Sequence, residues 1–457
     1  MENTLRRRRP LDILPYSLAM LGLVLIVVAG FNLLLSRESQ ANITTTTDDV
    51  FQLRAAIDLR IERLQELLEV RPEDQYAYVQ LAGVYLQKVR ETGDPSYYAR
   101  AEDVLLRALK LQPNDSNAMA VMGSLNLGRH QFQEALSWAE RSIEIAPETA
   151  SAYGVLGDAQ VELGQYDAAV DSFQAMVDLK PNLDSYSRVS YIRELMGDVD
   201  GAIEAMQMAT AAGAARTEAT AWARVQLGNL YFSSGRRDEA SKHYEAALRD
   251  FSGYYLTLAA LGKARAGQGL YDEAIDLYEL SVEIIPQPSA LAALGDLYAK
   301  TGNVEEARLQ YDTVEFIDEL GTINQVLYNR QIVLFYADHG LRPGRALELA
   351  RKELAVRKDI YGYDAFAWAL YKNGQYDEAA DAITEAMRLG TQDANLYYHA
   401  GMIYNQLGDK ELAREYLERA LRLNPEFSIL QSDVAKRTLE DLGEEAALPD
   451  TRGGTMR

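Results

Sequence analysis

Apolar and small residues recur along most of the chain at the spacing of paired helices. In segment 394–426, ANLYYHAGMIYNQLGDKELAREYLERALRLNPE, apolar side chains at positions 4, 7 and 11 fall on one helical face. Segment 150–182 shares three landmarks with it: a glycine near position 15 (Gly164, Gly408), an alanine at 20 (Ala169, Ala413) and a proline at 32 (Pro181, Pro425). Since glycine permits a turn and proline ends a helix, each segment predicts a helix–turn–helix unit.

The same unit, of about 34 residues, recurs ten times in near-perfect succession. The units begin near Gln75, Ser116, Ala150, Leu183, Ala221, Tyr255, Pro288, Leu327, Ile360 and Ala394. This pattern resembles the tetratricopeptide repeat (TPR) family. The resemblance implies an all-α fold, a superhelical solenoid of about ten repeats over residues 73–427. Extra residues interrupt the period around 91–97, 217–220 and 322–326, and these insertions could bend or divide the array.

Both ends of the array have a helical pattern that can cover an exposed apolar face. Residues 49–72 place Ile57, Ile61, Leu64 and Leu68 on one face, and are interpreted as a capping helix or half-repeat. A short dimerising coiled coil is the alternative for this segment. Residues 428–443 are expected to form the closing helix, and 444–457 a flexible tail.

The beginning of the chain differs from the repeats in both hydropathy and charge. Residues 13–36 carry no charged side chain over 24 positions, which is enough for a membrane-spanning helix. Four arginines, Arg6 to Arg9, precede this run, so residues 1–12 are expected to be a basic cytoplasmic stub. A polar linker, 37–48, would then lead to an array on the extracytoplasmic side, periplasmic or at the cell surface. A cleaved signal peptide is the alternative, and it delivers the array to the same side.

Composition and charge narrow the functional classes. The 457 residues have a formal net charge of −22, and because residues 1–36 carry +2, the remainder carries −24. An acidic surface disfavours binding of nucleic acid. The chain has no cysteine and four histidines, and the sequence contains no phosphate-binding glycine loop, metal-ligand spacing or nucleophile motif. We therefore expect no catalytic residue, cofactor or metal.

The remaining candidate site is the concave groove that the resemblance implies, lined by positions 2, 5, 6, 9 and 12 of each first helix. In the last three units six of these fifteen positions are aromatic, against one in the first three. Aromatic side chains with a few polar partners are typical of a binding hot spot. The predicted groove residues are Tyr328, Gln331, Phe335, Tyr361, Asp364, Trp368, Tyr371, Asn395, Tyr398 and His399. The alternative for this set is packing against the closing helix or against the next coil of the superhelix.

These observations predict a non-catalytic, membrane-tethered scaffold, of bacterial type, that captures a peptide or protein partner. An accessory or regulatory subunit of an envelope enzyme or assembly machine is the alternative, and an enzyme with an unrecognised site is a remote one. The sequence does not specify the partner or the oligomeric state.

Overall fold

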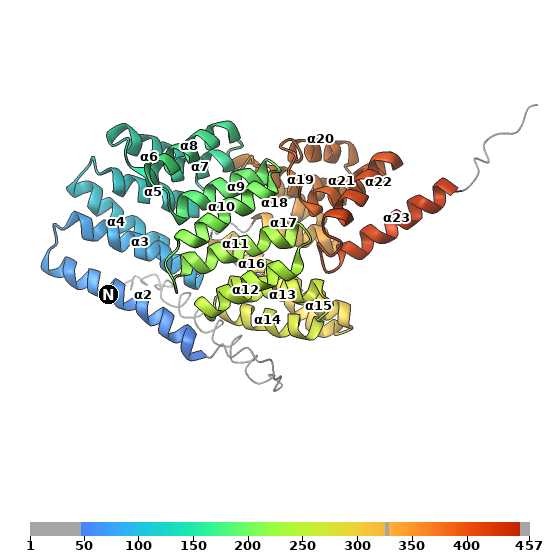
Figure 1. The fold of residues 1–457 in the computed structure, drawn as a ribbon, viewed down its shortest axis with the longest axis horizontal. Coiled ribbons are helices and arrows are strands. Elements are labelled where there is room, and N and C mark those ends of the chain that lie inside the picture. Colours follow the sequence, from blue (N-terminus) through green and yellow to red (C-terminus); the bar gives the residue numbers. More distant parts are fainter. Residues whose placement is uncertain (1–46, 325–328, 448–457) are drawn as a thin grey trace, which may run out of the picture. The chain divides into compact units, whose positions relative to one another are not determined.

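The computed structural model describes residues 47–324 and 329–447. Within these ranges the chain forms 22 helices, packed as ten successive pairs between α2 (Thr47–Val70) and α23 (Gln431–Ala447) (Figure 1). The first helices of the pairs are α3 (Gln75–Thr92), α5 (Ser116–Gly128), α7 (Ala150–Glu162), α9 (Leu183–Leu195), α11 (Glu218–Ser233), α13 (Tyr255–Gly267), α15 (Pro288–Thr301), α17 (Asn329–His339), α19 (Ile360–Lys372) and α21 (Ala394–Leu407). The second helices are α4 (Ser96–Leu111), α6 (Phe132–Ile145), α8 (Tyr166–Leu179), α10 (Val199–Ala212), α12 (Arg237–Asp250), α14 (Tyr271–Ile284), α16 (Val304–Asn324), α18 (Pro343–Val356), α20 (Tyr376–Ala386) and α22 (Lys410–Leu423).

The predicted all-α fold of paired helices is confirmed, and eight of the ten first helices begin at the predicted residue. Helix α11 begins three residues earlier than predicted, because the Thr217 hydroxyl accepts a hydrogen bond from the Thr220 amide and caps the helix there. The extra residues around 91–97 lengthen α3 as well as the turn that follows it.

Close contact within a pair depends on the glycine at repeat position 8. A Cβ atom added to Gly157 would lie 2.3 Å from the Phe173 ring, and one added to Gly228 would lie 2.3 Å from the Tyr244 ring. In both pairs the large residue stands at position 24 of the same repeat. The absence of a side chain on one helix therefore makes room for a large side chain on the other.

Helix α2 packs on the first pair of the same chain. Ile57 and Ile61 are buried in one cluster with Leu81, and the Lys88 ammonium lies 2.5 Å from the Asp58 carboxylate. At the other end Leu442 of α23 is buried beside Leu417 of the last pair. Each end helix thus covers the face that its neighbouring pair would expose.

Late loops of the array also contact early turns. The Ile360 amide donates to the Tyr166 hydroxyl at 2.8 Å, and the Lys358 amide donates to the Glu162 carbonyl at 2.8 Å. The Thr391 hydroxyl donates to the Leu195 carbonyl. We call these three hydrogen bonds, together with a fourth between Asn424 and Phe232, the return contacts.

The further return contact joins the end of the last pair to the fifth. The Asn424 side-chain amide donates to the Phe232 carbonyl at 3.0 Å. Across the three repeats involved, the bonded residues are separated by 194, 196 and 192 positions. A nearly constant separation means that successive early turns meet successive late loops in register.

The described residues contain no helix that is both long and apolar enough to cross a membrane. The predicted stub 1–12, anchor 13–36 and most of the linker 37–48 lie outside the described residues, as does most of the tail 444–457.

Candidate functional site

The predicted groove residues lie on three first helices. Helix α17 carries Gln331 and Phe335, and α19 carries Tyr361, Asp364, Trp368 and Tyr371. Helix α21 carries Asn395, Tyr398 and His399, whereas Tyr328 lies outside the described residues. Gln331 and Asn395 are exposed, Tyr361 and Tyr371 are half-buried, and the other described members are buried.

One packed aromatic group surrounds Trp368 and consists of Tyr371, Tyr398 and His399. Phe335 packs separately, against Tyr336 and His339. The Trp368 ring stacks on Tyr371 at a centroid distance of 4.6 Å and on His399 at 4.3 Å. Its indole N–H donates to the Asp338 carboxylate at 2.8 Å. The structure thus brings these aromatic side chains together and encloses most of them.

His399 is held by a carboxylate from the preceding repeat. Its Nδ1 lies 2.7 Å from the Asp364 Oδ1 atom, and both side chains are buried. Burial by itself lowers the pKa of His399, but the charge and hydrogen bond of Asp364 outweigh it and raise that pKa above the ordinary value. The pair is an internal link between α19 and α21.

Residues 427–431 of the chain itself cover the aromatic group. The Tyr398 hydroxyl donates to the Gln431 side-chain carbonyl at 2.6 Å, and the Tyr398 and Phe427 rings lie 5.4 Å apart. The Gln431 side-chain amide also donates to the Asp338 carbonyl at 3.2 Å. Contact of Trp368 or Tyr398 with a partner would thus need displacement of this segment. A binding role for the whole set stays a prediction.

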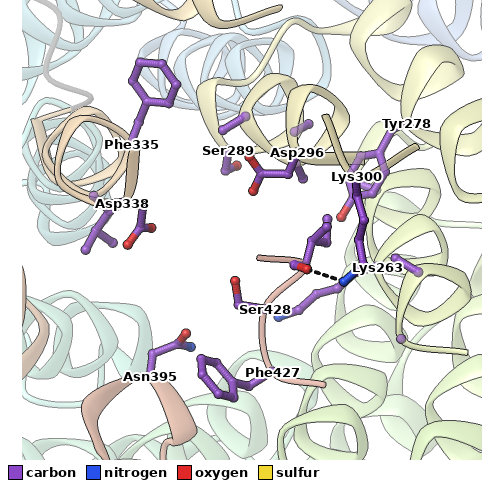
Figure 2. A pocket seen from close by; sticks show the side chains of 18 of the residues that line it. Lys263, Tyr278, Ser289, Asp296, Lys300, Phe335, Asp338, Asn395, Phe427 and Ser428 are labelled. Carbon is purple, nitrogen blue, oxygen red and sulfur yellow. Dashed lines mark hydrogen bonds between the residues drawn. The ribbon is translucent and has the colours of Figure 1, made fainter. Parts of the chain in front are cut away.

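The exposed members open onto a cavity of about 470 Å³, which we call the downstream cavity (Figure 2). Helices α13, α15, α17 and α21 and the segment 426–429 line it, and Gln331, Phe335 and Asn395 contribute to its wall. Lys300 fixes the wall, because its ammonium donates to the Ile429 carbonyl at 2.8 Å and lies 3.0 Å from the Asp433 carboxylate.

Most charges of the downstream cavity are paired. Both ring nitrogens of His339 lie 2.7 Å from an acceptor, the Phe335 carbonyl and the Asp296 carboxylate, so the imidazole must carry two protons to donate to both. Among the described residues Lys263 forms no ion pair, and its ammonium lies 4.7 Å from the centre of the Phe232 ring. Burial lowers the pKa of Lys263.

A second cavity, of about 660 Å³, lies along the preceding first helices, and we call it the upstream cavity. It is lined mainly by α7, α9 and α11, with Arg90 at the end of α3. Tyr191 and Trp222 provide half-buried aromatic surface, and Gln226 and Asn229 provide amides. The two cavities follow one another along the first helices, since α11 lines one and α13 the other.

Among the carboxyl groups of the upstream cavity, Glu194 has the most strongly shifted pKa. Burial, and then the nearby Asp393 carboxylate, raise its pKa to about 7. A raised pKa is the consequence of removing a carboxylate from water without placing a cation beside it. Within the described ranges no group of three or more His, Asp or Glu side chains could hold a metal ion.

Family comparisons agree with the repeat geometry. Tetratricopeptide repeat models match residues 122–184, 155–217 and 225–289, and another matches residues 394–427. The chain contains tetratricopeptide repeats.

Two curated relatives share stretches of this TPR array. Protein O-mannosyl-transferase TMTC1 of Homo sapiens is 27% identical over 220 residues, covering 47% of this chain and 24% of that protein. The TPR repeat-containing protein YpiA of Bacillus subtilis is 23% identical over 255 residues, covering 49% of this chain and 60% of that protein. The chain thus spans less than two thirds of the length of these relatives.

Among solved structures, the human IFIT1 dimer with m7Gppp-AAAA aligns with a TM-score of 0.45 at 16% identity. The alignment covers 81% of this chain and 87% of that one. Yeast Tom70 aligns with a TM-score of 0.38 at 14% identity over 88% of this chain and 95% of that one.

Several cavity residues of the TPR array were missed by sequence reasoning, which compared only the first and last three units. The groove positions of the fourth unit include Arg188, Tyr191 and Glu194. Those of the fifth unit include Trp222, and those of the sixth include Lys263. The same repeat positions, applied to the middle of the array, would have identified all five.

Proposed function

We propose that this TPR array is a non-catalytic scaffold that holds an extended segment of a protein partner along its first helices. The observation that supports this proposal is the succession of two cavities on adjacent first helices. Together the walls of the two cavities extend from α7 to α17. They therefore offer many separate positions for the side chains of one bound segment. Cavities of this size, with mixed apolar and polar walls, are typical of ligand sites.

Photocrosslinking tests where the partner binds. A crosslinkable amino acid at Gln331 or Asn395, both exposed members of the downstream cavity, is expected to give partner adducts. The matched control is Thr384, which is exposed on second helix α20 and lines neither cavity. Equal adducts from Thr384 would contradict the proposal, because the partner would then not favour the first-helix face.

We further propose that residues 13–36 tether the scaffold to a membrane, with the array outside the cytoplasm. The uncharged run and the arginines before it support this arrangement. Tethering raises the local concentration of the array near membrane partners. A reporter that is active only outside the cytoplasm, fused at the C-terminus, is expected to be active. An inactive reporter on a well-expressed fusion would refute this orientation.

A further inference from the structure

The charges on the wall of the upstream cavity are unbalanced. Its wall includes Arg90 and Arg188 and four acidic side chains, Asp158, Asp184, Glu194 and Glu218, which leaves a formal charge of −2. In the downstream cavity, by contrast, His339 and Lys300 each have a carboxylate partner. The two cavities along the same surface therefore differ in the ligand charge that they favour.

Both arginines of the upstream cavity are already engaged. The Arg188 guanidinium contacts both oxygens of Asp158, with Nε–Oδ1 at 2.9 Å and Nη2–Oδ2 at 2.7 Å. The Arg90 Nε atom lies 3.6 Å from Glu218, which also accepts a hydrogen bond from Tyr254 at 2.9 Å. Because a paired arginine has little charge left to offer, an anionic ligand would meet a net repulsion here.

Two carboxyl groups remain without such partners. Neither Asp184 nor Glu194 forms an ion pair within 4.0 Å with any residue that the structure describes, and of the two only Asp184 interacts electrostatically with Arg188. The raised pKa of Glu194 has the same origin, since burial and Asp393 act on it with no cation to oppose them. A positively charged ligand group would supply the missing charge.

The aromatic side chains of the upstream cavity also favour a positively charged ligand group. Tyr191 and Trp222 line the cavity and are half-buried. Elsewhere in the molecule aromatic faces are occupied by basic side chains, such as Trp138 by Arg141 at 4.4 Å. Within the described ranges no lysine or arginine lies over the ring of Tyr191 or Trp222. Half-buried aromatic rings in a cavity that also holds carboxylates favour a lysine or arginine side chain.

We propose that the upstream cavity binds a lysine or arginine side chain of the partner segment, between the carboxylate of Glu194 and the ring of Trp222. This inference rests on the proposed function, because it places one side chain of the segment that the scaffold holds. The occupant is a basic residue within a peptide, since the upstream cavity, lined by α11, is followed by the downstream cavity, lined by α13.

Selection of peptides tests the proposal directly. Twelve-residue peptides are selected by phage display against the full chain in detergent, and their binding is measured by fluorescence anisotropy. We expect the selected peptides to share one lysine or arginine. Replacing that residue by norleucine should weaken binding about tenfold or more. The Glu194→Gln variant should cause a similar loss, and the two changes together should lose little more than either alone.

Matched variants separate a local effect from misfolding. Glu204→Gln changes an exposed glutamate on α10 and should leave affinity unchanged. Trp222→Leu should weaken the basic peptides but not their norleucine forms, and thermal unfolding by circular dichroism should show that each variant folds. Equal affinity of the basic peptides for wild type and Glu194→Gln would overturn the inference.

Three other results also decide the matter. Selected peptides without a shared basic residue, still blocked by Asn395→Trp in the downstream cavity, would refute the inference while leaving the proposed function intact. Failure to select any peptide that Asn395→Trp or Trp222→Leu weakens would count against both. If free arginine amide binds as tightly as the peptides, the occupant is a small cation and the assignment to a partner segment is wrong.

Discussion

At the scale of single residues, buried charges are the least expected feature of this repeat array. Arg357, in the loop after α18, is 7% exposed, and Glu353, one helical turn before it, is 1% exposed. The Arg357 guanidinium lies 2.8 Å from Glu353 and 2.5 Å from Glu162 of α7. One buried cation therefore offsets the charge of carboxylates from two distant repeats.

Removing that cation is expected to destabilise the fold strongly. Arg357→Ala leaves Glu353 and Glu162 without the guanidinium that contacts them, and loss of one partner of a buried pair costs about 3–5 kcal/mol. Arg351→Ala, in α18 but exposed, should change the free energy of unfolding by less than about 0.5 kcal/mol. Urea denaturation measures both. Comparable losses in the two variants would show that the burial of Arg357 is unimportant.

Glu194 is expected to make stability depend on pH. Its pKa is about 7 in the folded chain and near 4.5 when exposed, so the folded state holds the proton more tightly. Its contribution is therefore complete below pH 4.5 and is lost as the pH rises through 7. The groups facing it include Asp393, Tyr191 and Tyr361, and the pKa of Asp393 is itself raised by burial and by Asp364.

The Glu194→Gln variant tests this dependence. Its melting temperature, relative to wild type, should rise as the pH is taken from 5 to 8, because glutamine has no proton to lose. Glu204→Gln, at an exposed position, is the control and should show no such trend. A constant difference between Glu194→Gln and wild type across this range would refute the prediction.

At the scale of helices and turns, the turn glycines differ in what surrounds them. Gly197 (φ +79°) and Gly374 (φ +73°) both adopt the left-handed conformation within a repeat. A Cβ atom on Gly197 would lie 2.5 Å from the Gly390 carbonyl oxygen, whereas one on Gly374 would meet nothing within 4 Å. The turn at Gly197 therefore lies against a distant loop, whereas the turn at Gly374 does not.

Alanine substitution should separate these two requirements. Gly374→Ala is expected to cost about 1–2 kcal/mol, the penalty of a left-handed conformation for a residue with a side chain. Gly197→Ala should cost clearly more, because the new methyl group also pushes the Gly390 backbone away. Chemical denaturation of the two variants gives the difference. Equal costs would mean that the contact between turn 197 and loop 390 adds no stability.

The sequence predicted these elements well and their distant contacts not at all. The 34-residue period fixes which residues meet inside a pair, as Gly157 and Phe173 do, because that packing is local. The meeting of Leu195 with Thr391 depends on small rotations that accumulate over six repeats, and no local pattern encodes their sum. For the same reason the spacing indicates that the predicted groove residues lie on first helices, but it does not show that Phe427 packs against Tyr398.

At the scale of the whole array, the return contacts couple parts of the chain that a simple solenoid leaves independent. A repeat array whose units touch only their neighbours unfolds approximately as a sum of neighbouring terms. Here residues 195 and 391 share a buried hydrogen bond, so the fourth unit and the loop before the tenth unit depend on each other.

Hydrogen exchange should reveal this coupling. Thr391→Val removes the hydroxyl that donates to the Leu195 carbonyl, and the net loss of about 1 kcal/mol predicts roughly fivefold faster exchange in peptides around residues 193–200. Thr384→Val removes a hydroxyl that bonds only within its own helix and should leave that region unchanged. Identical exchange in both variants would argue against coupling.

The separation of 192 to 196 residues has a consequence for how such a chain can change in length. Most repeat arrays can gain or lose a unit internally, since only neighbours must fit. An extra unit of about 34 residues between positions 232 and 358 would move every later loop away from its early turn, and all the return contacts would be lost together. The number of internal repeats is therefore fixed by closure, as the size of a ring is, and whole units can be added without this penalty only at the ends.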